Sequence, residues 1–176
     1  MAMSPGLRKV ALTVHVTAAL GWIGAVVAYL ALVVTAMNRE DAQTLRAAWL
    51  AMELIGWRAI VPLSLASLLT GLVMSLGTRW GLFQHYWVSI SLALTVLATV
   101  ILLQHMQTVS FFAGLAAGTD DAVIGRLRSG LPGELVHAGI GLLVLIVIQI
   151  LNVYKPRGLT PYGRRKWREE SAASRA

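Results

Sequence analysis

The sequence from residue 10 to residue 37 reads VALTVHVTAALGWIGAVVAYLALVVTAM and contains no charged side chain. An α-helix rises about 1.5 Å per residue, so about 20 residues cross the roughly 30 Å hydrocarbon core of a bilayer. This run is also longer than the roughly 7–15 apolar residues of a cleaved signal peptide. Because a chain in lipid must satisfy its own backbone hydrogen bonds, we predict a retained membrane-spanning helix over residues 10–37.

Three further apolar runs cover residues 54–76, 87–115 and 131–154. Apolar residues make up 57% of the chain and charged residues 13%, against roughly 45–50% and 25% in soluble domains. This excess excludes an ordinary soluble globular protein, because too few polar residues remain to cover its surface. The sequence therefore predicts an all-α integral membrane four-helix bundle over residues 1–155 and a basic tail over residues 156–176.

The connections between the runs are short and leave no room for a soluble domain. The first connection, residues 38–53, begins with a polar turn. For the residues that follow, 42–52, the pattern predicts a separate amphipathic helix at the membrane interface. Pro62 is expected to bend the second span, and Pro156 and Pro161 are expected to keep the last helix from continuing into the tail.

Orientation follows from the Lys and Arg residues on the two sides of the membrane. Ten lie on the side of both termini: Arg8, Lys9, Arg79, Lys155, Arg157, Arg164, Arg165, Lys166, Arg168 and Arg175. Five lie on the other side: Arg39, Arg46, Arg58, Arg126 and Arg128. We therefore expect both termini in the cytoplasm, in a multi-pass protein of a bacterial inner membrane. Aromatic residues near the span ends fit interfacial belts: Trp80, Tyr86 and Trp87 on the inner side, Trp49 and Trp57 on the outer side.

This placement of basic residues explains the formal net charge of +7. The charges are expected to set the topology and to contact anionic lipid head groups, so no nucleic acid is expected as a partner. The expected partner is the lipid bilayer. A membrane redox partner and a homo-oligomer are left open by the sequence.

Cysteine is absent from the chain. Its absence excludes disulfides, iron–sulfur clusters, thiolate zinc sites and covalently attached c-type haem. Any metal must then be held by His, Met, carboxylate or carbonyl groups. The chain also lacks a glycine-rich phosphate loop, the HExxH zinc motif and the GxSxG nucleophile elbow, so the sequence leaves open whether the protein is an enzyme.

Three of the four histidines fall inside predicted spans, where polar side chains are costly and often functional. With the last two spans centred near residues 100 and 143, His105 lies ~7 Å and His137 ~9 Å to the outer side of the midplane. His15 lies ~12 Å to the inner side, and His85 lies near the inner surface. The third and fourth spans run in opposite directions, and yet His105 and His137 are predicted at nearly the same depth.

Two neutral imidazoles at one depth on neighbouring helices meet the requirement for bis-histidine haem b ligation. We therefore take His105 and His137 as candidate cofactor-binding and metal-binding residues. Gln104 and Gln107 flank His105 and are candidate hydrogen-bond partners of the ligands.

Two alternatives stay open for this pair of histidines. The same side chains could hold another metal such as copper, or they could form a purely structural contact between membrane helices. Glu134 lies within about a turn of the outer end of its span, where its side chain is expected to reach the surface. We therefore expect no carboxylate partner inside the membrane for either histidine, so that each ring stays neutral.

His15, Trp22 and Tyr29 follow one another at intervals of seven residues, on one stripe of the first span. This spacing predicts a packing seam with one hydrogen-bonded imidazole. The alternative is that His15 is a cofactor ligand on the inner side or a donor to a bound head group. In the second span, small residues are expected to form a ridge for close packing: Ser67, Gly71 and Ser75.

Several stretches resemble known membrane proteins. His15, Trp22 and Gly24, within HVTAALGWIG, resemble the first helix of copper resistance protein D (CopD)-like membrane proteins and of related uncharacterised actinobacterial four-span proteins. Four further stretches resemble the latter group, so that the resemblance covers most of the chain: QHYW (84–87), LQHM (103–106), VHAG (136–139) and YKPRGLTP (154–161). The resemblance implies metal or haem handling in the membrane, carried by His15, His105 and His137.

The leading prediction is therefore a small integral membrane protein that holds haem b, or less favourably copper, for electron transfer or metal handling. The alternative is a cofactor-free accessory subunit or a protein that binds a small lipid.

Overall fold

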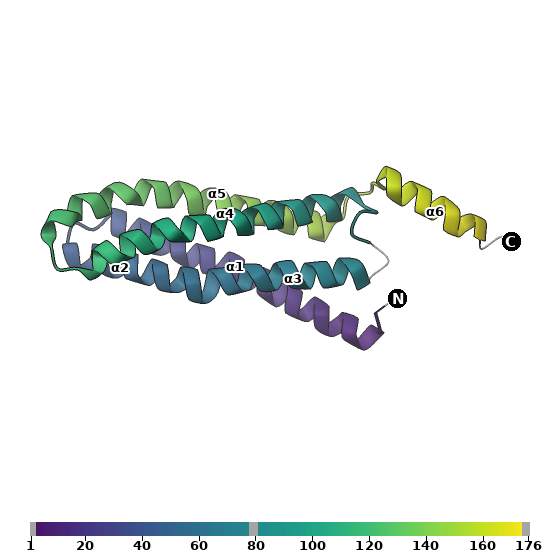
Figure 1. Cartoon of the computed structure of the whole chain (residues 1–176), viewed down its shortest axis with the longest axis horizontal. Helices are drawn as coiled ribbons and strands as arrows, with labels where there is room; N and C mark the ends of the chain where they lie inside the picture. Colours follow the sequence, from purple (N-terminus) through teal and green to yellow (C-terminus); the bar gives the residue numbers. More distant parts are fainter. Residues whose placement is uncertain (1–2, 78–80, 174–176) are drawn as a thin grey trace.

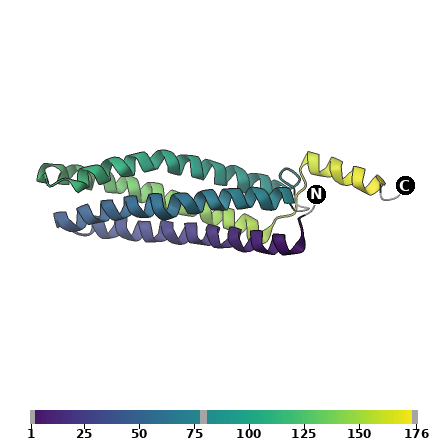
Figure 2. The same cartoon turned by 60° about the horizontal axis from the view of Figure 1, so that its bottom comes forward.

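A computed structural model describes residues 3–77 and 81–173 of the chain. Four long helices lie side by side in a narrow bundle, and a short helix extends beyond one end of it (Figure 1 and Figure 2). The described residues contain no β-strand, in agreement with the predicted all-α class. Each of the four long helices is long and apolar enough to cross a membrane.

Helix α1 covers Pro5–Met37 and includes the first predicted span. Ser4 caps its N-terminus by accepting a hydrogen bond from the backbone N–H of Leu7. Pro5 occupies the first turn, where its missing N–H leaves no intrahelical bond unmade. The helix ends at the polar turn that the sequence predicted.

The second span is one unbroken helix. It consists of α2 (Ala42–Ile55), a π-helical turn η1 (Gly56–Ile60) and α3 (Val61–Gly77). The widened turn comes directly before Pro62, whose ring has no N–H to donate and crowds the carbonyl group of Arg58 four residues earlier. The π turn therefore accommodates the proline inside the span.

The prediction of a separate interfacial helix over residues 42–52 is wrong. The apolar face of α2 packs inside the bundle, where Leu45, Trp49 and Met52 are fully buried. Close packing of these three side chains against the neighbouring helices stabilises this arrangement, with contacts that a helix lying on the membrane surface would not make.

Helices α4 (Tyr86–Ala117) and α5 (Ile124–Tyr154) form the third and fourth spans, and the short 3-10 helix η2 (Asp121–Val123) joins them. Helix α5 ends at Lys155, which adopts the left-handed conformation with φ of 45°. Pro156 follows and cannot continue the helix, and Pro161 starts the tail helix α6 (Pro161–Ala173).

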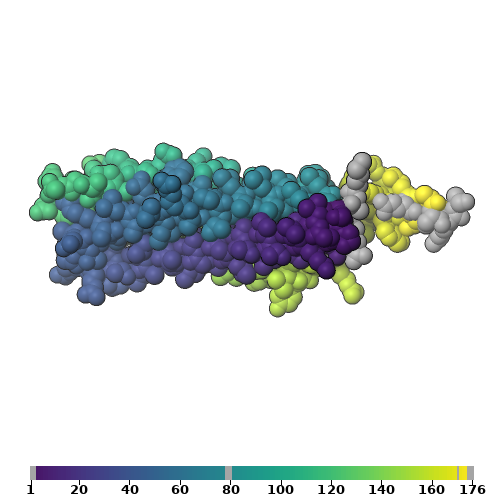
Figure 3. Space-filling view, turned by 90° about the horizontal axis from the view of Figure 1, so that it is seen from below, coloured from purple at the N-terminus to yellow at the C-terminus, as the bar shows by residue number. Residues whose placement is uncertain are grey.

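Each long helix packs against its neighbours in sequence, and α5 closes the ring by packing on α1. Figure 3 shows α1 and the following helix covering one face of the bundle. The core draws large side chains from every span, among them Trp22, Tyr29, Leu45, Trp49, Met106, Val109, Leu127 and Leu131. Many other large apolar side chains are exposed on the outward faces, as helices that face lipid require.

The predicted aromatic belts are only partly present. Tyr86 is exposed at the start of α4, and Trp57 is exposed in the π turn, in the middle of its long helix. Trp49 and Trp87 are buried in the bundle. Trp80 lies outside the described residues. Position along a span sets the depth of a side chain, whereas the rotation of the helix sets whether that side chain faces the lipid or the core.

The bundle has two different ends (Figure 1). The loop end holds the connections from α1 to α2 and from α4 to α5, and the terminal end holds the start of α1, the connection from α3 to α4, and α6. At the terminal end His85 and Leu159 form an isolated antiparallel bridge, and the backbone N–H of Thr160 donates to the Gln84 carbonyl oxygen. These contacts tie the start of the tail to the start of α4.

Candidate functional site

His105 of α4 and His137 of α5 lie in contact, as their predicted depths indicate. Their rings are stacked, with centroids 3.5 Å apart and planes inclined by 10°. Both side chains are partly buried. Two antiparallel neighbouring helices thus bring two imidazoles together inside the bundle.

Glu134 of α5 joins this pair. Its Oε2 atom lies 2.8 Å from Nε2 of His105 and accepts a 2.6 Å hydrogen bond from the hydroxyl group of Tyr29 on α1. The Glu134 side chain is only 2% exposed, so the expectation that it reaches the surface is wrong. Glu134 precedes His137 by three residues, which places both on one face of α5. We call Tyr29, His105, Glu134 and His137 the loop-end cluster.

The loop-end cluster also contradicts the expectation that His105 has no carboxylate partner. A buried charge is costly unless it is paired or neutralised. One proton held between Oε2 of Glu134 and Nε2 of His105 joins the two groups, whichever atom holds it. The Tyr29 hydroxyl donates to the same oxygen in either case, so the carboxyl group is held from two sides.

A cavity of about 190 Å³ adjoins the cluster, and we call it the loop-end cavity. Tyr29, His105 and His137 line it together with apolar side chains of α1, α4 and α5. Met106 lines it as well, although it directly follows His105 in the sequence. The thioether sulfur of Met106 packs against Gly56 of η1, where a Cβ atom would lie 2.6 Å from it.

Gln104 and Gln107 do not take the role that the sequence suggested. Both side chains are exposed, because they lie to either side of the face of α4 that His105 occupies. The hydrogen-bond partner of His105 comes from α5 instead.

His15 lies away from the loop-end cluster. Its Nδ1 atom lies 3.0 Å from Thr70 Oγ1 and 3.2 Å from the Ser67 carbonyl oxygen on α3. It lines a different cavity, of about 260 Å³, at the terminal end. Trp22 and Tyr29 are buried along the same stripe of α1, so the predicted packing seam is confirmed.

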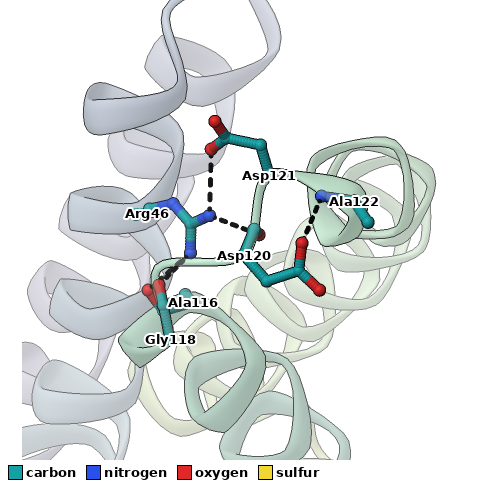
Figure 4. Close-up of polar contacts among 6 residues, drawn as sticks. All are labelled: Arg46, Ala116, Gly118, Asp120, Asp121 and Ala122. Carbon is teal, nitrogen blue, oxygen red and sulfur yellow. Dashed lines mark hydrogen bonds and ion pairs between the residues drawn. The ribbon is translucent and has the colours of Figure 1, made fainter.

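Arg46 of α2 binds the connection between α4 and α5 at the loop end (Figure 4). The guanidinium group of Arg46 on α2 donates to the carbonyl oxygens of Ala116, Gly118 and Asp120, and it lies 3.4 Å from the Asp121 carboxylate. Carbonyl groups at the end of a helix have no partner within the helix. Arg46 supplies that partner for α4 and joins α2 to the connection that leads into α5.

The arrangement of the two imidazole rings limits which of the cofactors suggested by the sequence can be ligated. Haem b held by two histidines needs two ring nitrogens that point at each other across a macrocycle. His105 and His137 are stacked face to face, and His105 Nε2 is turned to Glu134, so a macrocycle does not fit between them in this structure. A single metal ion needs an in-plane nitrogen lone pair from each ring aimed at one point, so one of the two nearly parallel rings would have to turn to bind an ion together with the other. Copper accepts both imidazole and thioether ligands.

Within the described ranges, no three side chains of the His, Cys, Asp and Glu types are arranged to hold a metal ion. A metal ion in the loop-end cavity would therefore depend on His105 and His137 together with Met106. This donor set fits copper, whereas it lacks the third His or carboxylate that zinc sites use.

Sequence reasoning missed Glu134 and Tyr29 as members of the cluster. A signal for Glu134 was present, because a carboxylate within a span three residues before a histidine lies on the same helix face. Nothing in the sequence joins Tyr29 to Glu134, since 105 residues separate them.

Comparison with known proteins adds no family or relative to this description: no family model, no curated protein and no solved structure matches the chain.

Proposed function

We propose that the chain is a small integral membrane protein that binds a transition-metal ion through His105 and His137, with copper favoured over haem b. The observation that carries the proposal is the contact of two imidazoles from neighbouring helices at a cavity inside the bundle. The protein then serves metal handling or electron transfer in the membrane. A bound copper ion would supply one-electron redox chemistry.

The surroundings of the rings support this assignment. Nε2 of His105 is hydrogen-bonded to Glu134. Nδ1 of that ring is therefore the nitrogen left to bind the metal. Carboxylate partners of this kind orient ligating histidines and increase their basicity. Tyr29 fixes the carboxylate in turn. Met106 lines the same cavity, and its sulfur, which packs against Gly56, would become a soft donor if the flexible side chain turned toward the rings.

Haem b is the less favoured cofactor for two reasons. The stacked rings of His105 and His137 would have to separate to admit a macrocycle. The loop-end cavity, at about 190 Å³, is also smaller than the roughly 300–1,000 Å³ of sites that hold drug-sized ligands.

The experiment is a titration of the purified, full-length protein with Cu(I) against a chromophoric competitor, beside metal analysis and an absorption spectrum of the protein as isolated. We expect a single tight Cu(I) site. Glu134→Gln should weaken it by about 10–100-fold, because an orienting partner is lost, and His105→Ala and His137→Ala should weaken it at least as much. Met106→Leu should weaken it less, and Met74→Leu at the terminal end is the matched control.

A Soret band that disappears in both His105→Ala and His137→Ala would show that the same residues bind haem instead. If the wild type binds neither metal nor haem, or if His85→Ala removes the site while the two cluster variants keep it, the proposal fails.

A second candidate function is the binding of a small lipid-soluble molecule without any cofactor. The observation that favours it is the loop-end cavity itself, which is lined by apolar side chains such as Leu102, Ile140 and Val144 with His105 and His137 at its edge. Pockets of this composition commonly bind small apolar ligands. Native mass spectrometry of protein extracted with its lipids would show such a ligand as a mass that His105→Ala reduces.

We also propose that both termini lie in the cytoplasm, on the basis of the ten Lys and Arg residues that the sequence assigns to the side of the termini against five on the other side. The loop-end cluster then lies in the outer half of the membrane. Because the chain has no cysteine, single probes can be placed by Ser174→Cys and Thr119→Cys. In intact cells an impermeant thiol reagent should label Thr119→Cys only, and labelling of Ser174→Cys alone would reverse the orientation.

A further inference from the structure

The cavity at the terminal end differs in kind from the loop-end cavity. It lies between all four long helices, has a volume of about 260 Å³, and is called the terminal cavity below. Uncharged polar side chains line it, including Ser75, Ser91, Thr95, Gln149 and Asn152, and so does the exposed Lys155. Polar groups on helices this apolar need hydrogen-bond partners, because lipid supplies none.

Ser91 is the side chain whose partner is missing. Ser75 and Thr95 donate to carbonyl oxygens of their own helices. The side chain of Ser91 is 6% exposed, and among the residues that the structure describes its hydroxyl oxygen has no hydrogen-bond partner. Burying an unpaired hydroxyl is costly. Ser91 belongs to the cavity wall, and its hydroxyl oxygen has almost no exposed surface, so the side chain would turn toward the cavity to reach a partner held there.

His15 supplies a hydrogen-bond acceptor to the same cavity. The Thr70 hydroxyl donates to the Ala66 carbonyl oxygen at 2.6 Å, and the Ser67 carbonyl oxygen can only accept. Nδ1 of His15 faces both the Thr70 oxygen and the Ser67 oxygen, so it carries the ring proton. In the neutral ring Nε2 is then an acceptor, on the edge away from Nδ1. Gly71 makes room for the ring, since a Cβ atom there would lie 3.2 Å from Cε1 of His15.

These features define the chemistry of a ligand. His15 on α1 offers an acceptor, and Ser91 on α4 offers a hydroxyl that can donate. Trp87, which is also in the cavity wall, adds an aromatic surface. A molecule that reaches this cavity from the bilayer must be uncharged and soluble in lipid. A flat ring with a hydroxyl group and a second oxygen meets all of these requirements.

We propose that the terminal cavity binds the oxygen-bearing ring of a lipid-soluble quinol or quinone. A hydroxyl group of the ligand donates to Nε2 of His15, and a ring oxygen accepts from the Ser91 hydroxyl. The quinol binds more tightly than the quinone, because only the quinol has a hydroxyl group for His15. None of these residues belongs to the proposed metal site, so the two proposals stand or fall separately.

The test uses the full-length protein in detergent, with decylubiquinol and decylubiquinone as probes. Both should raise the melting temperature, because a ligand that binds only the folded state stabilises it. The affinity derived from the shifts should be roughly 3–10-fold higher for the quinol, as one additional hydrogen bond provides. His15→Ala should remove this preference.

Ser91→Ala separates ligand binding from a merely structural role. Without a probe it should raise the melting temperature slightly, because an unpaired hydroxyl is removed, and with either probe the shift should shrink. Thr99→Ala, on the same helix, is the matched control, since Thr99 is buried but its hydroxyl already donates to Thr95. It should leave the response to both probes unchanged.

The proposal is overturned if neither probe shifts the wild type, or if Ser91→Ala responds to the probes as the wild type does. A probe response that His105→Ala removes while Ser91→Ala keeps it would place the ligand in the loop-end cavity instead. Copper affinity should be the same in Ser91→Ala, His15→Ala and the wild type, whichever way the quinol test ends.

Discussion

The two ends of the bundle hold a histidine of a long apolar helix in different ways. At the loop end, His105 pairs with the buried carboxyl group of Glu134 and stacks on His137. At the terminal end, His15 bonds only to uncharged oxygens of α3, beside a cavity with polar walls. Partners on two other helices, α5 and α1, hold the loop-end cluster around His105, whereas α3 alone supplies both hydrogen-bond partners of His15.

The two ends of the bundle also differ in the size of their side chains. Large side chains close the loop end, where the rings of Trp49 and Phe112 stack with centroids 4.6 Å apart. Small residues such as Ser67, Gly71 and Ser91 line the terminal cavity. The comparison indicates that the loop end contributes more of the stability, while the terminal end keeps space for a ligand.

The largest expected effect compares a tryptophan at each end. Trp49 is fully buried and its ring N–H donates to the Leu127 carbonyl oxygen at 3.2 Å. Trp49→Ala should lower the free energy of unfolding by about 3–5 kcal/mol, the scale for large core truncations. Trp87→Ala should lower it by less than half as much, because Trp87 borders a cavity. Unfolding in detergent measures both, and equal losses would contradict the division between the ends.

The next effect concerns the hydrogen bond between Tyr29 and Glu134. Tyr29→Phe should cost about 1.5–3 kcal/mol, the range for a hydrogen bond to a charged group. In a Glu134→Leu background the same change should cost little, because its partner is already gone. Tyr154→Phe is the control, since Tyr154 is 79% exposed. A full Tyr29→Phe cost that persists without Glu134 would mean that the contact contributes nothing.

A smaller effect is expected for Arg46, which binds the connection between α4 and α5. Arg46→Ala should cost about 1–2 kcal/mol, because carbonyl oxygens after α4 lose their donor. Arg46→Lys should restore only part of this, since one ammonium group cannot reach several oxygens as a guanidinium fork does. Arg126→Ala, at an exposed position, should leave the melting temperature nearly unchanged, and an equal loss there would argue against a specific role of Arg46.

The smallest effect is a pH dependence at the start of α2. The hydrogen bond from the backbone N–H of Thr44 holds the pKa of Asp41 below its usual range. A carboxyl group with a lowered pKa stabilises the folded state above about pH 4, and this contribution is lost as the pH falls through the folded pKa. Asp41→Asn keeps a capping side chain that does not titrate in this range. Its melting temperature should fall less than that of the wild type between about pH 6 and pH 3, and parallel curves would contradict this.

Much of the architecture follows from local properties of the sequence. The length and hydropathy of each run predicted the four spans, and the constant rise of a helix predicted that His105 and His137 lie at one depth. The heptad spacing of Trp22 and Tyr29 predicted a buried stripe of α1, which the structure has. These predictions hold because each depends on counting along a single helix.

The sequence by itself determined the four long apolar helices, their order and the matching levels of His105 and His137 along them. Only the tertiary structure decided which side chains meet at a given depth. It turned Glu134 toward Tyr29 and His105, directed Trp49 into the core, and left Ser91 facing a cavity. The physical reason is that rise along a helix is the same for every sequence, whereas helix rotation and side-chain rotamers depend on the packing of all four helices together.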